Sequence, residues 1–186
     1  MRYLIFTLVR IIEKIPLVRL YQVIEFDKVS FLMIPKSGTR SIRDARLMLD
    51  GVLSGDSITV FKKNLIVSQY YRFLTLKQLD VYIKKKEVYY VYRSWDERVK
   101  SCWRQKIKHG SGYYFWMYYP FIRPKISEED FSNFVQKLPE PLREKHFSSY
   151  ADLTLLSDLK RIDLSNLDSI LFDLVGKEVR SNVTNS

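Results

Sequence analysis

A lysine, a glycine and several hydroxyl residues lie together where an apolar run gives way to a helical pattern. The run 29–34 predicts a strand ending at Pro35, and residues 40–49 predict a helix beginning directly after the small residues. Gly38 allows the backbone to approach a ligand, and the first amides of a helix have no partner within it. The helix dipole is positive at that end, and Lys36 adds a full positive charge. The segment therefore predicts an anion site made of Lys36, Ser37, Gly38, Thr39, Arg40 and Ser41.

One other interpretation of this segment stays open. The pentapeptide 35–39 also suits an ordinary polar turn between a strand and a helix. It does not match a Walker A loop, because that motif places its lysine after its second glycine, whereas Lys36 precedes Gly38. A second motif is needed to decide between a ligand site and a simple turn.

An arginine with similar surroundings occurs further along the chain. Residues 87–92 are aromatic and β-branched, as in a buried strand, and the run stops at Arg93. Ser94 and Glu97 then form a capping box, and apolar residues repeat at helical spacing as far as Ile107. Arg93 is therefore predicted at the carboxyl end of a strand, where open α/β sheets bind ligands.

The order of the predicted strands and helices indicates the fold class. In the rest of the chain, the apolar and turn patterns predict a connection at 51–57, a short strand at 64–68, and helices at 75–83, 127–138 and 165–175. Strands followed by helices, repeated at least three times, predict an α/β single domain with a central, mostly parallel sheet flanked by helices.

Residues 110–124 are dense in aromatic side chains and predict a loop or lid. That stretch is either a satellite hydrophobic cluster or a wall that stacks against a sugar ring or adenine.

Composition limits the class of partner. The chain has 186 residues, 46% of them hydrophobic, which is enough for one well-formed core. A formal charge of +10 favours polyanionic partners, among them nucleotides, acidic polysaccharide, nucleic acid and an anionic membrane surface. The single cysteine, Cys102, excludes an intrachain disulfide, and one cysteine with two histidines argues against a structural zinc site. A reducing compartment, and hence the cytoplasm, is the expected location.

The N-terminal segment has two interpretations. The apolar run 3–9 is followed by charged residues and Pro16, so it is shorter than the roughly 20 residues of a membrane span. It also lacks the small-residue cleavage site of a signal peptide. Residues 1–28 are predicted to be helical, either packed on the domain or lying as a basic amphipathic segment on a membrane surface. The expected organisation is this segment, a main domain at 29–176 and a frayed tail at 177–186.

Together the two motifs resemble those of sulfotransferases that use PAPS (3′-phosphoadenosine 5′-phosphosulfate). The order lysine, small residue, glycine, threonine resembles the family's phosphosulfate loop, and residues 89–106 resemble the second signature of its carbohydrate branch. Ser94 and Trp95 replace an aspartate–proline pair of that signature. A weaker similarity around His146 follows, and the resemblance covers residues 29–176. It implies a P-loop-like nucleotide-binding architecture, with residues 36–41 on the phosphosulfate.

The resemblance further implies roles for single residues. Arg93 and Ser101 would bind the 3′-phosphate, and Lys36 would neutralise the oxygen that leaves with the nucleotide. No histidine lies at 67–72, where the family often places its base, and Tyr70 is a poor base because its reference pKa is about 10. The first candidate is therefore His146, and the alternatives are His109, Asp44 and Asp56.

The expected acceptor is a hydroxyl group of a saccharide, already acidic, with a lipid or a peptide tyrosine as alternatives. Neither a metal ion nor nucleic acid is expected as a partner. Two rival functions remain. A small kinase would need a Walker A loop and a magnesium-binding aspartate after a strand, neither of which is evident. A non-enzymatic basic module would explain the charge of +10, but not two anion sites at strand-to-helix junctions.

Overall fold

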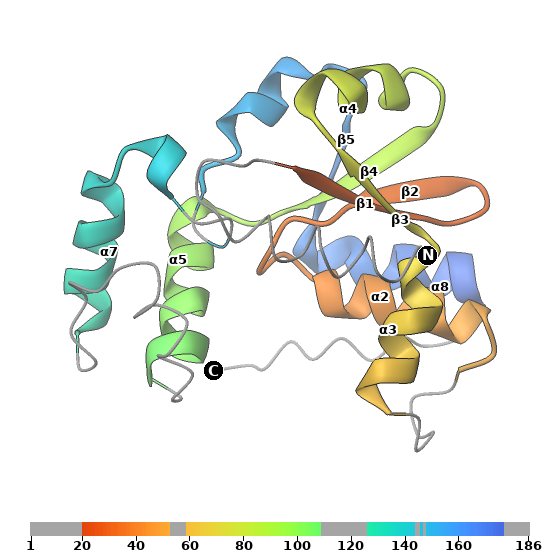
Figure 1. The fold of residues 1–186 in the computed structure, drawn as a ribbon, viewed down its shortest axis with the longest axis horizontal. Helices are drawn as coiled ribbons and strands as arrows, with labels where there is room; N and C mark the ends of the chain where they lie inside the picture. Colours follow the sequence, from red (N-terminus) through yellow and green to blue (C-terminus); the bar gives the residue numbers. More distant parts are fainter. Residues whose placement is uncertain (1–19, 53–58, 109–125, 144–145, 147, 177–186) are drawn as a thin grey trace.

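Five strands form one mixed sheet at the centre of the molecule (Figure 1). The computed structural model describes residues 20–52, 59–108, 126–143, 146 and 148–176. The strands lie in the order β3-β1-β2-β4-β5. Their bounds are Tyr21–Glu25 for β1, Val29–Leu32 for β2, Tyr71–Leu74 for β3, Glu87–Tyr92 for β4 and Lys160–Asp163 for β5.

The sheet is only partly parallel, which corrects the prediction of a mostly parallel sheet. β2, β4 and β5 run parallel, with Leu32 opposite Tyr90 and Tyr92 opposite Asp163. β1 pairs antiparallel with both β2 and β3. The reason is the connection between β1 and β2, which has only residues 26–28 and is closed by the Phe26 amide donating to the Val29 carbonyl at 2.9 Å. So short a connection can join only antiparallel neighbours.

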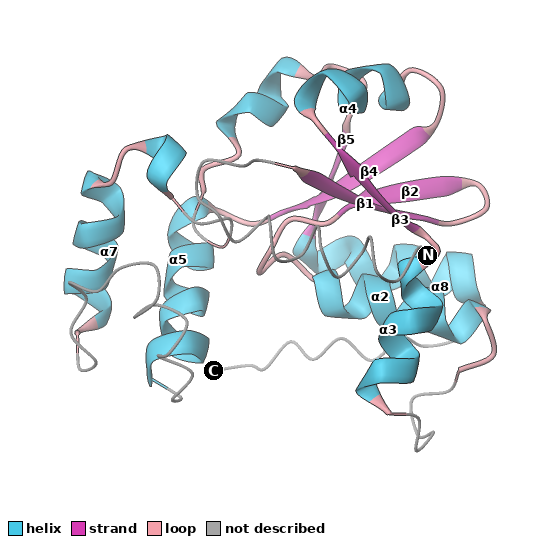
Figure 2. Cartoon of the chain, in the orientation of Figure 1, coloured by secondary structure: helices cyan, strands magenta, loops and turns pink. Residues whose placement is uncertain are grey.

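Six α-helices surround the sheet in the described part of the chain (Figure 2). They are α2 (Thr39–Leu49), α3 (Val60–Ser68), α4 (Leu76–Ile83), α5 (Trp95–Trp103), α7 (Glu128–Lys137) and α8 (Leu167–Val175). α5 continues as a π-helical turn, η1 (Arg104–Lys108). Short 3-10 turns are η2 (Glu140–Leu142), η3 (Ala151–Leu155) and η4 (Leu164–Asn166). The described residues thus form one α/β domain.

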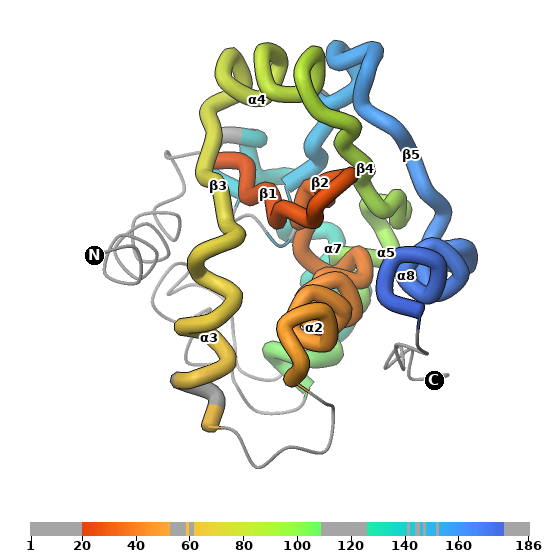
Figure 3. Tube along the Cα trace, turned by 90° about the vertical axis from the view of Figure 1, so that its right-hand side faces the viewer, coloured from red at the N-terminus to blue at the C-terminus, as the bar shows by residue number. Residues whose placement is uncertain are grey.

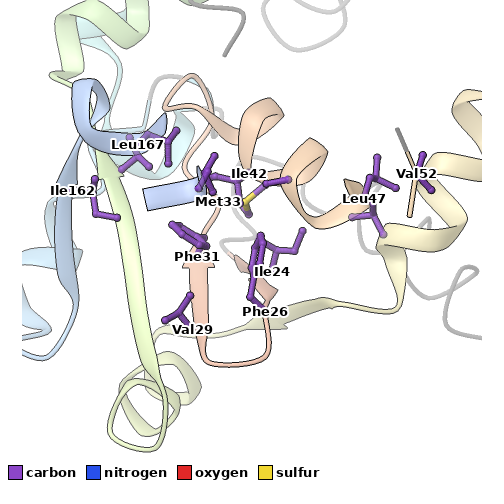
Figure 4. Close-up of a cluster of buried hydrophobic side chains, with 14 residues drawn as sticks. Ile24, Phe26, Val29, Phe31, Met33, Ile42, Leu47, Val52, Ile162 and Leu167 are labelled. Carbon is purple, nitrogen blue, oxygen red and sulfur yellow. The ribbon is translucent and has the colours of Figure 1, made fainter. Parts of the chain in front are cut away.

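Alternating strand residues build a core on each face of the sheet. On one face Ile24 and Phe31 pack with Ile42 of α2 and Leu167 of α8 (Figure 4). On the other face Val23 and Leu32 belong to a second buried cluster that includes Leu79 of α4 and Leu153 of η3. The tube view agrees, with α2, α3 and α8 on one side of the sheet and α4 on the other (Figure 3). α5 and α7 pair beside the sheet through Val99, Cys102, Phe131 and Val135.

Several local predictions are confirmed. The predicted capping box of Ser94 and Glu97 opens α5. The helix predicted at 75–83 is α4, and it opens on a capping box of Thr75 and Gln78 that was not predicted. Ser127 caps α7, and Gly176 ends α8 with φ 67°. The last helix begins at Leu167, two residues later than predicted at 165, because a 3-10 turn comes first.

Two predicted elements are wrong. Residues 64–68 are the end of helix α3, not a strand, because Thr59 caps a helix that starts at Val60. Residues 21–25, assigned to the N-terminal helical segment, are strand β1. Residues 1–19, most of the connection at 51–57, the aromatic stretch 110–124 and the tail 177–186 lie outside the described residues. Among the described helices, none is long and apolar enough to cross a membrane.

Candidate functional site

The two sequence motifs meet at one edge of the sheet. β2 and β4 are parallel neighbours, so the loop after β2 and the residues after β4 leave the sheet side by side. The Arg93 side chain crosses from one to the other, where its Nη1 donates to the Lys36 carbonyl at 3.1 Å. Residues that are 57 positions apart in sequence therefore form one site. Arg93 lies at the predicted place, between the end of β4 and the start of α5.

The loop between β2 and α2 has an unusual backbone. Lys36 and Gly38 both have left-handed conformations, with φ 67° and 73°. This region costs a side chain about 1–2 kcal/mol, so Lys36 is held there by its surroundings. Gly38 has a second reason to be glycine, because a Cβ atom there would overlap Cδ2 of Leu167 and lie 3.3 Å from Cδ1 of Leu164. Leu167 of α8 and Leu164 of η4 thus pack closely against the loop at Gly38.

The hydroxyl residues of the loop differ in exposure. Ser37 is 1% exposed, and its Oγ has no hydrogen-bond partner in the part of the chain that the structure describes. A buried hydroxyl without a partner is costly, so it calls for an explanation. Ser41 is also buried, Thr39 is half-buried as the first residue of α2, and Arg40 is exposed. The first turn of α2 contains no acidic residue, which leaves its positive end for an anion.

Lys36 lies in a strongly positive environment. Burial lowers the pKa of Lys36. Lys106, Arg93 and Arg40 lower it further, while the nearby Cys102 opposes them. The Lys36 ammonium donates to the side-chain amide oxygen of Gln105 in η1. A desolvated ammonium among other cations suits the binding of a ligand with more than one negative charge.

Gln105 and Lys106 are the site residues that sequence reasoning missed. Their only local signal is spacing, because Lys106 follows the apolar Cys102 by four positions and so falls on the same side of a helix. Nothing in the sequence indicates that this side of α5 and η1 returns to the loop after β2. The contact depends on how α5 is set against the sheet.

The buried side chain of Arg98 holds residues 148–149 against α5. Arg98 is 3% exposed, and its Nη2 donates to the carbonyls of Ser148 at 2.5 Å and Ser149 at 3.4 Å. Its guanidinium carbon lies 5.1 Å from the centre of the Tyr150 ring, and burial lowers the pKa of Arg98. Glu140 holds the same segment from the other side by accepting from the Ser148 hydroxyl at 2.7 Å and the Ser149 amide at 2.8 Å. The segment that follows the candidate base is therefore fixed to α5.

The remaining predicted residues lie on several different elements. Ser101 is half-buried on α5, two turns beyond Arg93, and His146 is a half-buried residue of a turn after η2. Asp44 lies on α2, and burial raises its pKa, with Arg43 opposing. Tyr70 has a structural role, since its hydroxyl donates to Asp50 Oδ1 at 2.9 Å. His109 and Asp56 lie outside the described residues.

The described residues contain no group of three or more histidine, cysteine, aspartate or glutamate side chains that could hold a metal ion. No family model matches the chain, and neither a curated protein nor a solved structure matches it.

Proposed function

We propose that the protein is a PAPS-dependent sulfotransferase, which moves a sulfuryl group to an acceptor hydroxyl. The observation that supports this most is the hydrogen bond from Arg93 to the Lys36 carbonyl, which brings two basic motifs together at the carboxyl ends of parallel strands. In the proposed P-loop-like architecture, β2, residues 33–38 and α2 form the strand, loop and helix that carry the anion. Ligands of open α/β sheets bind at such a place.

The donor has two anionic ends, and the site offers groups for both. Residues 36–41 would hold the 5′-phosphosulfate, with Lys36 and the first amides of α2 as donors. Arg93 and Ser101 would hold the 3′-phosphate. A guanidinium has five N–H donors, so Arg93 can keep its bond to the Lys36 carbonyl and still contact a phosphate.

The reaction would be an in-line displacement at sulfur. The acceptor oxygen forms a bond to sulfur while the bond from sulfur to the bridging oxygen of the 5′-phosphate breaks. PAP (adenosine 3′,5′-bisphosphate) leaves with that electron pair, and the acceptor proton passes to a base, for which His146 is the first candidate. Positioning and charge stabilisation supply most of the catalysis in the related phosphoryl transfers. Lys36 would stabilise the charge on the leaving oxygen, so no metal ion is required.

The acceptor is proposed to be an acidic saccharide. The net charge of +10 supports an anionic partner. A cytoplasmic location, with the residues that precede β1 in contact with a membrane surface, completes the proposal. The aromatic stretch that would stack on sugar rings lies outside the described residues.

Ligand screening by thermal shift tests the donor class. Because a ligand that binds only the folded state raises Tm, PAP should raise it more than ADP, ATP or NAD at equal concentration. A preference for ATP would favour a kinase, and stabilisation by polyanions alone would favour a non-enzymatic basic module.

Turnover of the Lys36→Ala variant tests the catalytic role. If Lys36 acts mainly on the charge that develops in the transition state, its removal should lower kcat more than it weakens PAP binding. Weaker PAP binding with unchanged turnover at saturation would contradict the role given to Lys36.

A further inference from the structure

The chain after β4 touches Lys36 at two different atoms. Arg93, before α5, holds the Lys36 carbonyl through its Nη1. Gln105, in the π-helical turn after α5, accepts a hydrogen bond from the Lys36 ammonium through Oε1. π-helical turns are rare and occur often at functional sites. The same helical segment therefore fixes both the backbone and the side chain of this lysine.

The acceptor for this ammonium is an amide, although a carboxylate would bind it more strongly. Lys36 is partly desolvated, and the ionisable groups that act on its pKa are Lys106, Arg93 and Arg40, which lower it, and the Cys102 thiol, which raises it. A carboxylate at position 105 would form an ion pair and cancel the lysine charge. An uncharged amide oxygen can orient the ammonium and leave the charge for a ligand.

We propose that Gln105 is a positioning residue for Lys36, which holds the ammonium at the loop after β2 by an uncharged hydrogen bond and so leaves its positive charge uncompensated and directed toward an anionic ligand. This inference rests on the proposed function only in taking PAP as that ligand. The structural requirement is specific, because the residue must accept a hydrogen bond and carry no charge.

The Gln105→Glu variant separates positioning from a purely structural role. Glutamate has nearly the same shape and can accept the same hydrogen bond, and residue 105 is exposed, so the fold should be retained. The pKa of Lys36 should rise in this variant, as followed by side-chain NMR of the ligand-free protein. PAP affinity, measured by calorimetry, should fall about tenfold or more, because the new ion pair competes with the ligand.

Gln136→Glu provides the matched control. Gln136 is an exposed residue of α7, so this variant makes the same change in net charge on another helix. Its PAP affinity and the pKa of its Lys36 should equal those of the wild type. Equal losses of PAP affinity in both variants would overturn the inference, because net charge alone would then explain the effect.

The two readouts also separate this inference from the proposed function. A Lys36 pKa that is unchanged by Gln105→Glu overturns the inference alone, whatever the protein binds. A raised pKa with unchanged PAP affinity overturns it as well. If the wild type binds inorganic phosphate or sulfate but not PAP, the donor proposal fails, and affinities of the same variants for that ion then decide the role of Gln105. If the wild type binds no anion, both proposals fail.

Discussion

At the residue scale, the site depends on how Arg93 divides its hydrogen bonds. One guanidinium nitrogen holds the Lys36 carbonyl, and Lys36 itself has a positive φ that few side chains adopt. Arg93 therefore holds the loop through one hydrogen bond, in addition to its proposed contact with a phosphate. The two roles predict different losses of nucleotide affinity when the side chain is removed.

Replacement of Arg93 by alanine should weaken PAP binding about 10- to 100-fold and hardly affect AMP. A hydrogen bond to a charged group contributes about 1.5–3 kcal/mol, and AMP lacks the 3′-phosphate that Arg93 is proposed to bind. Ser101→Ala should cost less, about 1 kcal/mol, because its hydroxyl is uncharged. Calorimetry with both nucleotides measures the difference, and Lys62→Ala, which removes an exposed cation of α3, is the control. Equal weakening of PAP and AMP by Arg93→Ala would leave Arg93 only its role in holding the loop.

At the scale of elements, the loop after β2 is shaped by helix α8. Leu167 at the start of α8 is 1% exposed and packs where a side chain at position 38 would have to lie. The anion loop, α2 and α8 are therefore a single packed unit. A change at Gly38 should disturb all three.

Gly38→Ala should destabilise the fold by about 2–5 kcal/mol. The strain of a left-handed alanine contributes about 1–2 kcal/mol, and overpacking against Leu167 contributes about 1–3 kcal/mol. Gly51→Ala is the matched control, because Gly51 also has a positive φ of 78° but no atom lies within 4 Å of its added Cβ. This variant should lose only the strain contribution to its stability, about 1–2 kcal/mol. Urea denaturation measures both, and equal losses would exclude the packing of Leu167 as a cause.

A partly buried polar cluster of Tyr82, Glu25 and Ser30 joins helix α4 to the opposite face of the sheet. The Tyr82 hydroxyl donates to Glu25 Oε1 at 2.9 Å and lies 2.9 Å from the Ser30 hydroxyl. Burial raises the pKa of Tyr82 to about 12, with Ser30 opposing and Glu25 adding to the effect. The folded state therefore keeps this proton at pH values where the unfolded state, with a pKa near 10.0, loses it.

The stability of the protein should fall as the pH rises from 10 toward 12. In that interval the unfolded state binds fewer protons at Tyr82 than the folded state, so raising the pH favours unfolding. Tyr82→Phe should remove this part of the alkaline loss, and at neutral pH it should cost about 1–3 kcal/mol because Ser30 and Glu25 lose a partner. Denaturant unfolding at several pH values measures both effects. Tyr92→Phe, at an exposed tyrosine of β4, is the control and should stay close to the wild type at neutral pH.

At the scale of the whole molecule, the charge of +10 should act on the acceptor more than on the fold. If the acceptor is an acidic saccharide, its KM should rise steeply with salt, because screening weakens long-range attraction.

Tyr113→Ala and Trp116→Ala, in the aromatic stretch, should raise the KM of the acceptor with little change in the KM of PAPS. Acceptor kinetics unchanged by both variants would assign that stretch to packing instead.

Some of this arrangement was determined by the sequence alone, because its causes are local. The capping box at Ser94, the helix 75–83 and the strand 87–92 depend on hydrogen bonds and periodicity within a few residues. The placement of Arg93 directly after a strand follows from them. The strand predicted at 64–68 is wrong, because a short apolar run is equally compatible with the end of a helix.

Other features were decided only by the tertiary structure, because they join segments that are distant in the chain. The antiparallel pairing of β1 with β3 brings together residues about 50 positions apart. The bond from Arg93 to Lys36, the contact of Gln105 with the Lys36 ammonium, and the packing of Leu167 on Gly38 are of the same kind. Residues of these types can form hydrogen bonds or packing contacts with many different partners. Sheet order and helix packing select which neighbours they have, and therefore which side chains share the candidate site.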